Sequence, residues 1–239
     1  MKLHSLFLAG LMIISVNAQA MSAAEYDNYT EVLAPSYIEE FANAINMSQL
    51  SVNVSYPLST TEVDDRCVAL MDGKMISGEV GKALSQIYLE NQTNFSHLVL
   101  GGSVKNKYCP RYGKMTAKEK SIVWVFILTA MAHFESNCSK TAAAKGPNGT
   151  AYGYFQLHKG HESEYDGDKG ICKNGDAGKP AAASKCTLAM LDKQFENRQG
   201  ELFSNKSYWD VLRPTGSSKK WSVIRKALMR SSLCNPQTI

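Results

Sequence analysis

The chain has 239 residues, of which 44% are hydrophobic and 20% are charged, and its formal net charge is +4. This composition fits a globular protein of one or two domains with a substantial core. Lysines are scattered among acids instead of being concentrated in one stretch, which argues against a nucleic-acid-binding protein. The charge leaves at most a weak attraction to anionic polymers such as a cell wall.

The N-terminus has the features of a secretory signal peptide. A lysine at position 2 precedes an apolar run from Leu6 to Val16, and Ala18-Gln19-Ala20 supplies the small residues of a cleavage site. An uncleaved membrane anchor is the alternative, but the run is shorter than the roughly 20 residues that a span needs. We therefore predict a signal peptide over residues 1–20, a secreted or periplasmic protein, and no membrane span after the signal is removed.

All six cysteines follow the predicted cleavage point, and an even count in an exported chain favours disulfides. Closely spaced ligand pairs of the C-x-x-C type are absent from the sequence, so we expect no metal. Spacing alone does not choose among the 15 pairings that six cysteines allow. Our prediction is Cys172 with Cys186, Cys67 with Cys109, and Cys138 with Cys234.

The first part of the mature chain reads as a helical appendage. Helix formers dominate from Ala23 to about Leu50, and residues 21–65 are predicted as an N-terminal helical extension. A second helix is expected from Val80 to Gln92. Proline and glycine then predict a turn over Tyr108 to Gly113.

The next helix has the clearest start signal in the chain. Thr116 and Glu119 have the spacing of a capping box, so the helix is predicted from Ala117 to about Ser136. Its apolar residues cover every side, which is typical of a helix enclosed by others. Glu135 lies at its end, where burial disfavours the ionised carboxylate and raises its pKa. Glu135 is therefore a candidate general acid.

From Thr141 to Pro180 the composition predicts mostly loop, interrupted by Tyr152 to Leu157. Helices are expected again from Lys185 to Gln199 and from Trp221 to Ser231. The predicted fold is mostly α, with one helical domain over residues 66–239.

The Glu135-Ser136 pair, together with the downstream segment Gly153 to Leu157, resembles the soluble lytic transglycosylase and goose-type lysozyme family. Members of that family have a helix-ending Glu-Ser and a loop carrying Gly-Leu-Met-Gln, where this chain has Tyr154-Phe155 in place of Leu-Met. The resemblance is strong from Thr116 to Trp209. It implies a lysozyme-like helical domain with a loop-rich cleft, and an enzyme that cuts β-1,4 linkages between amino sugars.

By this resemblance Glu135 is the catalytic acid and base; the alternative is a helix-end glutamate that makes only local hydrogen bonds. Ser136 would orient the carboxylate or cap the backbone, and Gly153 would leave room for a sugar ring. Tyr208 would replace a tyrosine of an Ala-Tyr-Asn segment that this chain lacks, with a packing role equally open. The substrate-binding residues so predicted are Ser136, Tyr152, Gly153, Tyr154, Gln156 and Tyr208, although Tyr154 and Phe155 are also candidates for the core.

A loop with four acids in eight residues, His161 to Asp168, is the candidate source of a second carboxylate. Glu164, Asp166 and Asp168 are the candidates, and a solvated acidic loop is the alternative. An acidic rim would suit cationic, deacetylated glucosamine, so a preference for deacetylated glycan is one hypothesis. Hydrolysis and anhydro-sugar formation both stay open, because the family manages with one carboxylate when the substrate's acetamide or 6-hydroxyl attacks.

The sequence leaves two rival interpretations. His133-Phe134-Glu135 matches half of the zinc deaminase signature, but the P-C-x-x-C half is missing. A glycan-binding or inhibitory module with a lysozyme-like fold and no catalysis is the second rival. We expect a monomer that acts on peptidoglycan or a related amino-sugar polymer without cofactor, metal or nucleic acid.

Overall fold

The helix predicted from the capping box runs through the centre of the structure, a computed structural model that describes residues 65–71, 77–146, 149–167 and 169–235. These residues all belong to one unit, Ser51–Ile239. The predicted signal peptide and, except for Asp65, the predicted N-terminal extension lie outside the described residues.

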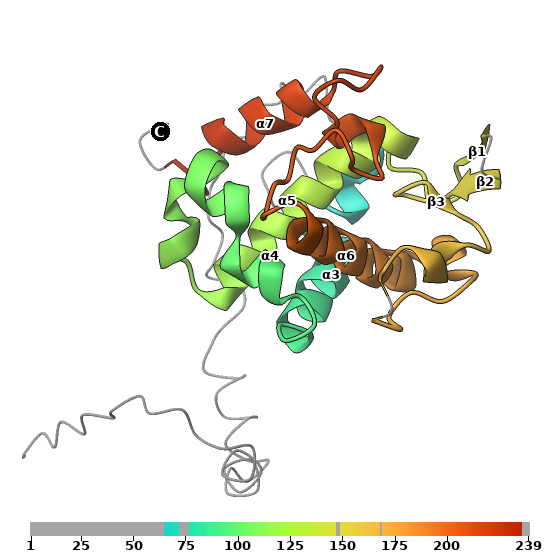
Figure 1. The fold of residues 1–239 in the computed structure, drawn as a ribbon, viewed down its shortest axis with the longest axis horizontal. Coiled ribbons are helices and arrows are strands. Elements are labelled where there is room, and N and C mark those ends of the chain that lie inside the picture. Colours follow the sequence, from blue (N-terminus) through green and yellow to red (C-terminus); the bar gives the residue numbers. More distant parts are fainter. Residues whose placement is uncertain (1–64, 72–76, 147–148, 168, 236–239) are drawn as a thin grey trace, which may run out of the picture. The chain divides into compact units, whose positions relative to one another are not determined.

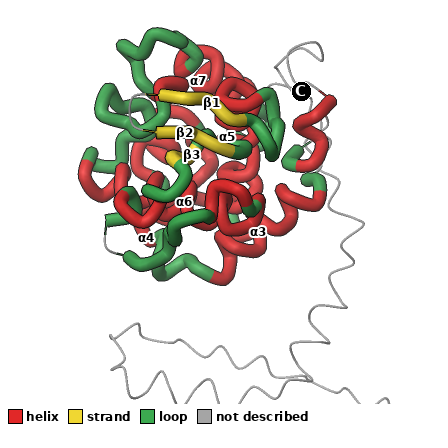
Figure 2. The backbone as a smooth tube through the Cα atoms, turned by 90° about the vertical axis from the view of Figure 1, so that its right-hand side faces the viewer, coloured by secondary structure: helices red, strands yellow, loops and turns green. Residues whose placement is uncertain are grey.

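The described residues form a mostly α fold with one small antiparallel sheet (Figures 1 and 2). The helices are α3 (Glu79–Glu90), α4 (Ser96–Leu100), α5 (Ala117–Ser136), α6 (Pro180–Asn197) and α7 (Trp221–Arg230). The strands β1 (Ala143–Gly146), β2 (Gly149–Tyr152) and β3 (Leu157–His158) pair in that order. The sheet lies to one side of the helices, beyond the C-terminal end of α5.

Helix α5 is the core of the fold. Its capping box forms as predicted, with the Glu119 amide donating to the Thr116 hydroxyl at 3.2 Å and the Thr116 amide donating to the Glu119 carboxylate at 2.7 Å. Every residue from Val123 to Ala132 is buried, and α5 contacts α3 and α7. The helix ends at Asn137, which has a left-handed φ of 50° and returns its amide to the carbonyls of the last turn. Glu135 therefore sits on a rigid support.

Two parts of the predicted secondary structure were wrong. Helix α6 begins at Pro180 instead of Lys185, because proline at the first helical position already has the helical φ and needs no amide partner. The segment from Thr141 to Pro180 contains the three strands that were not predicted. These strands are short and β1 is fully exposed, so they lack the alternating apolar pattern by which a strand is recognised.

The disulfide pairing was predicted in part. Cys172–Cys186 is confirmed, with Cα atoms 4.7 Å apart. The other two predicted pairs are wrong, because the structure joins Cys67 to Cys138 and Cys109 to Cys234. The short helix Asp65–Ala69 packs on α5, which brings Cys67 to the end of that helix. Pairing was thus decided by helix packing, which sequence spacing does not report.

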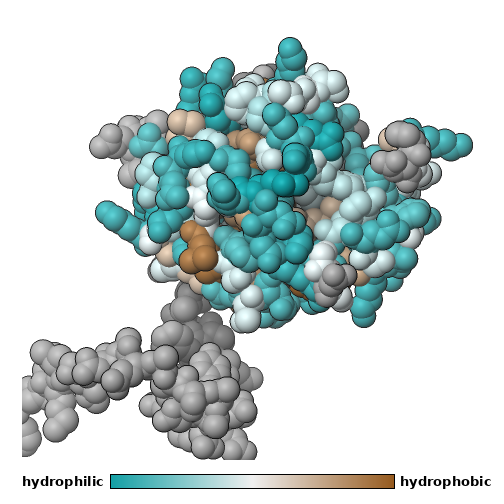
Figure 3. Space-filling view, in the orientation of Figure 1, coloured by the Kyte–Doolittle hydropathy of each residue, from teal (hydrophilic) through white to brown (hydrophobic). Residues whose placement is uncertain are grey.

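The surface seen in Figure 3 is largely hydrophilic, with small hydrophobic spots. Among the described residues, the large hydrophobic side chains that are exposed are Val68, Leu100 and Met229. Within the same residues, no helix combines the length and apolar character that a membrane crossing requires.

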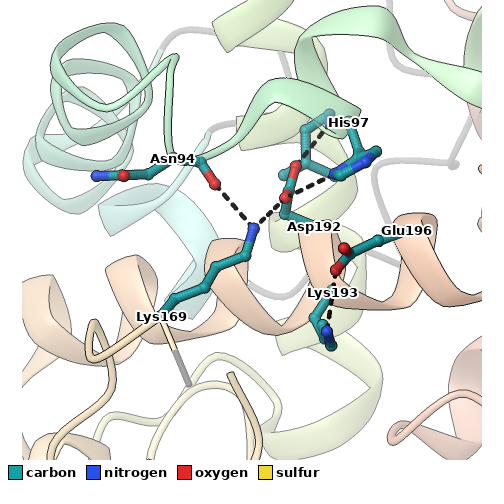
Figure 4. Close-up of polar contacts among 7 residues, drawn as sticks. Asn94, His97, Lys169, Asp192, Lys193 and Glu196 are labelled. Carbon is teal, nitrogen blue, oxygen red and sulfur yellow. Dashed lines mark hydrogen bonds and ion pairs between the residues drawn. The ribbon is translucent and has the colours of Figure 1, made fainter. Parts of the chain in front are cut away.

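A buried carboxylate in the C-terminal half of α6, that of Asp192, links α6 to α4 and to the loop that carries Lys169. Asp192 is fully buried and accepts from the Leu98 amide at 3.0 Å, while His97 lies 3.1 Å away and Lys169 completes the cluster (Figure 4). Lys169 also donates to the Asn94 carbonyl at 3.0 Å. Such a buried charge is tolerated because all its partners are polar or cationic. The cluster anchors the loop before Cys172 to α4 and α6.

Candidate active site

Glu135 occupies the last turn of α5 and is half-buried. The pKa of Glu135 is raised to about 7, chiefly by burial and next by the negative charge of Asp210. A hydrogen bond from the Val211 amide and the positive charge of Arg213 oppose this shift without cancelling it. The carboxyl is therefore protonated over most of the acid range, as the sequence predicted for a general acid.

Asp210 is the carboxylate whose charge acts on Glu135, a role that was not predicted from the sequence. Its side chain accepts from the Ser218 amide at 2.8 Å and the Ser217 amide at 3.2 Å. The pKa of Asp210 is lowered, chiefly by the Ser218 amide bond, so this carboxyl is ionised when Glu135 still holds its proton. Asp210 therefore loses its proton while Glu135 is still neutral. The charge of Asp210 raises the pKa of Glu135, whereas Glu135 has no charge that could raise the pKa of Asp210.

The only sequence signal for Asp210 was its position two residues after Tyr208, in the segment from Ser207 to Asp210. Arg213 holds this segment in place, since its guanidinium donates to the Ser207 carbonyl at 2.7 Å and the Tyr208 carbonyl at 2.9 Å. Arg213, like Asp210, was missed. Neither residue forms a motif in the sequence, because their relation to Glu135 arises only when the segment packs against α5.

Tyr208 joins this segment to the loop that carries the family resemblance. Its hydroxyl donates to the Gln156 carbonyl at 3.2 Å and accepts from the His158 amide at 3.0 Å. Burial raises the pKa of Tyr208, and the charge of Glu135 is among the further causes, so Tyr208 lies within electrostatic reach of the candidate acid. The structure thus places Tyr208 against the loop and within electrostatic reach of Glu135.

Ser136 connects the helix end to the same loop. Its hydroxyl lies 2.9 Å from the Ala132 carbonyl and 2.9 Å from the Tyr154 carbonyl. Of the two roles predicted for Ser136, the observed contacts are those of a backbone cap. They set the position of the Gly153 to Leu157 loop relative to Glu135.

Gly153 is required by the backbone, and the predicted room for a sugar ring is not what its missing side chain provides. Its φ is +76°, a region that favours glycine, and a Cβ at this position would lie 2.4 Å from the Ala177 carbonyl oxygen. The space beside Gly153 is therefore filled by the protein itself. This corrects the role expected from the resemblance.

Most side chains of the loop from Tyr152 to Gln156 are buried, although several of them were predicted to contact substrate. Gln156 is buried, and its amide donates to the Gly153 carbonyl at 2.9 Å and the Ala142 carbonyl at 3.2 Å, so it holds the loop in shape. Tyr154 is buried and Phe155 is fully buried in the core. Tyr152 stays half-exposed, with the Lys159 ammonium 5.5 Å from its ring centroid. Of these four, Tyr152 is the residue that solvent reaches.

The acidic loop serves mainly to organise backbone. Glu162 is fully buried and accepts from the Gly160, Gly175 and Ala177 amides. Asp166 is buried and accepts from two amides at 2.7 Å each, which gives it a structural role in place of the predicted role as second carboxylate. Glu164 is exposed and lies 2.7 Å from His161. Asp168 lies outside the described residues.

Comparison with known proteins adds a structural relationship. No protein-family model and no curated protein matches the chain. Solved structures of Bd0314 DslA, a Bdellovibrio protein, are similar to it. The wild-type structure has a TM-score of 0.52 at 20% identity, covering 65% of this chain and 92% of that chain. Two glutamate-to-glutamine mutants of that protein give TM-scores of 0.53 and 0.51 at 20% and 22% identity. At this identity the likeness concerns the fold alone.

Proposed function

We propose that the chain is an exported enzyme, a lysozyme or a lytic transglycosylase, that cuts β-1,4 linkages between the amino sugars of peptidoglycan. The observation that carries the proposal is the contrast between two carboxyls. Glu135 keeps its proton up to about pH 7, whereas Asp210 has a lowered pKa. Neighbouring carboxyls with separated pKa values are typical of acid catalysis on glycosides.

In the proposed reaction Glu135 donates its proton to the bridging oxygen as the bond from that oxygen to the anomeric carbon breaks. The ionised Asp210 contributes a negative field that favours the cationic character of the sugar in the transition state. The Glu135 carboxylate then accepts a proton from the attacking hydroxyl. If water attacks, the product has a reducing end; if the 6-hydroxyl of the same sugar attacks, the product is an anhydro sugar.

Export is supported by the cysteines. The structure pairs all six into three disulfides, which persist in oxidising compartments such as the periplasm or the extracellular space. The predicted signal peptide over residues 1–20 completes this part of the proposal.

A preference for deacetylated glycan stays part of the proposal in a narrower form. It was based on an acidic rim, of which Glu162 and Asp166 are buried. The field of Asp210 at Glu135 still favours a cationic sugar near the acid, and Glu164 is the described acid of the rim that stays exposed. The proposed preference therefore depends on these two carboxylates.

Product analysis tests the proposed function. Purified peptidoglycan, with and without prior chemical deacetylation, is incubated with the chain, and soluble fragments are weighed by mass spectrometry. We expect disaccharide-containing fragments, and an anhydro end is one water lighter than a reducing end. Saturable binding to peptidoglycan with no soluble fragments from either material would instead support the non-catalytic binding module.

The rate should depend on pH through Glu135. Because its pKa is raised to about 7, the acid form is present below that pH and is lost above it. We expect kcat/KM for a soluble peptidoglycan fragment to be level in the mildly acidic range and to fall about tenfold per pH unit above pH 7. Initial rates in buffers of constant ionic strength measure this. A rate that stays level up to about pH 9 would contradict the assignment of Glu135.

A further inference from the structure

Next to Tyr208 lies a cavity of about 150 Å³ that the proposed reaction does not use. This volume is several times the roughly 30 Å³ that a water molecule occupies in the liquid, so the cavity has room for a polyatomic group. The C-terminal half of α6 forms one wall, and side chains that precede and follow α6 in the chain complete it. Its lining includes Tyr165, Lys193, Arg198, Lys206, Tyr208 and Trp209.

The lining of this cavity is cationic. It contains Lys193, Arg198 and Lys206 and no carboxylate. Lys193 is already neutralised by Glu196 at 3.0 Å, one helical turn further along α6 (Figure 4). Among the described residues, Arg198 and Lys206 have no ion pair. Two exposed cations thus border the same cavity without an acidic partner, an arrangement that attracts an oxyanion.

The cavity is also lined by aromatic side chains that are held in place. The Tyr165 and Tyr208 rings lie 5.0 Å apart, and the Tyr208 and Trp209 rings also lie 5.0 Å apart. The Trp209 ring nitrogen donates to the Phe155 carbonyl at 2.8 Å, and the Tyr208 hydroxyl is fixed by the Gln156 to His158 backbone. Trp209 is buried, but Tyr165 and Tyr208 are half-exposed, and fixed aromatic rings of this kind suit the apolar face of a sugar ring. A sugar that carries an acid would satisfy both the cationic and the aromatic part of the lining.

Tyr208 connects this cavity to the candidate active site, because it lines the cavity and also feels the charge of Glu135. We propose that the cavity is a subsite for a carboxylate carried by the glycan, with Arg198 and Lys206 as its ligands. The inference rests on the proposed function and deepens it. The carboxylate comes either from a lactyl ether on the sugar or from a peptide attached to it, and both offer the same oxyanion.

Binding without turnover tests this subsite. The Glu135→Gln chain is titrated calorimetrically with three tetrasaccharides: chitotetraose, which has no carboxylate, and an alternating N-acetylglucosamine–N-acetylmuramic acid tetrasaccharide with and without stem peptides. Arg198→Gln and Lys206→Gln are then added together. We expect the ratio of the dissociation constants, acidic over neutral glycan, to rise about tenfold, since charge-assisted hydrogen bonds are lost only for the acidic ligand.

The matched control carries Lys114→Gln and Lys226→Gln, which also remove two positive charges, but from exposed positions outside the cavity. Its ratio should equal that of Glu135→Gln alone. A rise with the peptide-free muramyl ligand assigns the lactyl carboxylate, and a rise only with stem peptides assigns the peptide.

Equal ratios in the cavity variant and in the control, or no binding of any acidic glycan, would overturn the subsite. Failure of the proposed function is a separate result. If the wild-type chain releases no fragments but the ratio still rises, the subsite stands and the enzymatic proposal falls.

Discussion

Replacing Glu135 by glutamine is expected to lower kcat for peptidoglycan cleavage by about 10²–10⁴-fold, the usual contribution of a general acid. Glutamine has nearly the same shape and still accepts from the Val211 amide, but it has no acidic proton to transfer to the leaving oxygen. Fragment release by wild type and variant, measured at about pH 6, gives the ratio. Glu90→Gln, an exposed carboxylate on α3, is the control and should cleave at the wild-type rate.

The same substitution should also stabilise the fold above neutral pH, which separates loss of chemistry from loss of structure. In the folded chain burial raises the pKa of Glu135 from 4.5 to about 7. The folded state therefore loses stability as pH rises from about 4.5 to 7, because only the unfolded chain ionises freely. We expect Glu135→Gln to gain up to about 3 kcal/mol in the free energy of unfolding at pH 8, and little at pH 4. If the variant is inactive and also less stable than the wild-type chain at pH 8, the assignment of Glu135 as a buried acid is contradicted.

Removing the Cys109–Cys234 disulfide by a double alanine substitution is expected to lower the free energy of unfolding by about 5 kcal/mol in the chain-entropy model. The bond joins residues 125 apart in sequence, and both cysteines are buried. Cys172–Cys186 closes a separation of only 14 residues, for which the same model predicts about 3 kcal/mol.

Urea unfolding under non-reducing conditions measures both losses. The order matters more than the values, because packing changes at the two sites add to each. If removal of Cys172–Cys186 costs more than removal of Cys109–Cys234, loop closure is not what makes the longer disulfide stabilising. Peptide mapping of the oxidised protein checks the pairing itself.

The central helix was predictable from the sequence with its observed ends. Thr116 and Glu119 satisfy backbone amides close to them in the chain, and an apolar run on all sides has to be enclosed. Both signals are local, so position 135 was identified before any contact was known. The raised pKa of Glu135 follows from the same burial.

The partners of Glu135 were not predictable. Asp210 and Arg213 affect its pKa from a segment far along the chain, whereas the acids chosen near position 164 bond mostly to their own loop. The family resemblance led to Gly153 and Gln156, but the structure shows that they shape the loop. A motif reports which residues recur together, and it does not report which way their side chains point.

By itself the sequence determined the helix that carries Glu135 and the mostly α class, and its prediction of Cys172 with Cys186 was confirmed, because each depends on residues close together in the chain. The tertiary structure alone decided the other two disulfides, the charge of Asp210 beside Glu135 and the cationic cavity beside Tyr208. These depend on how α5, α6 and the segment after residue 206 pack. Packing is set by the summed burial of many side chains, so no single stretch of sequence encodes it.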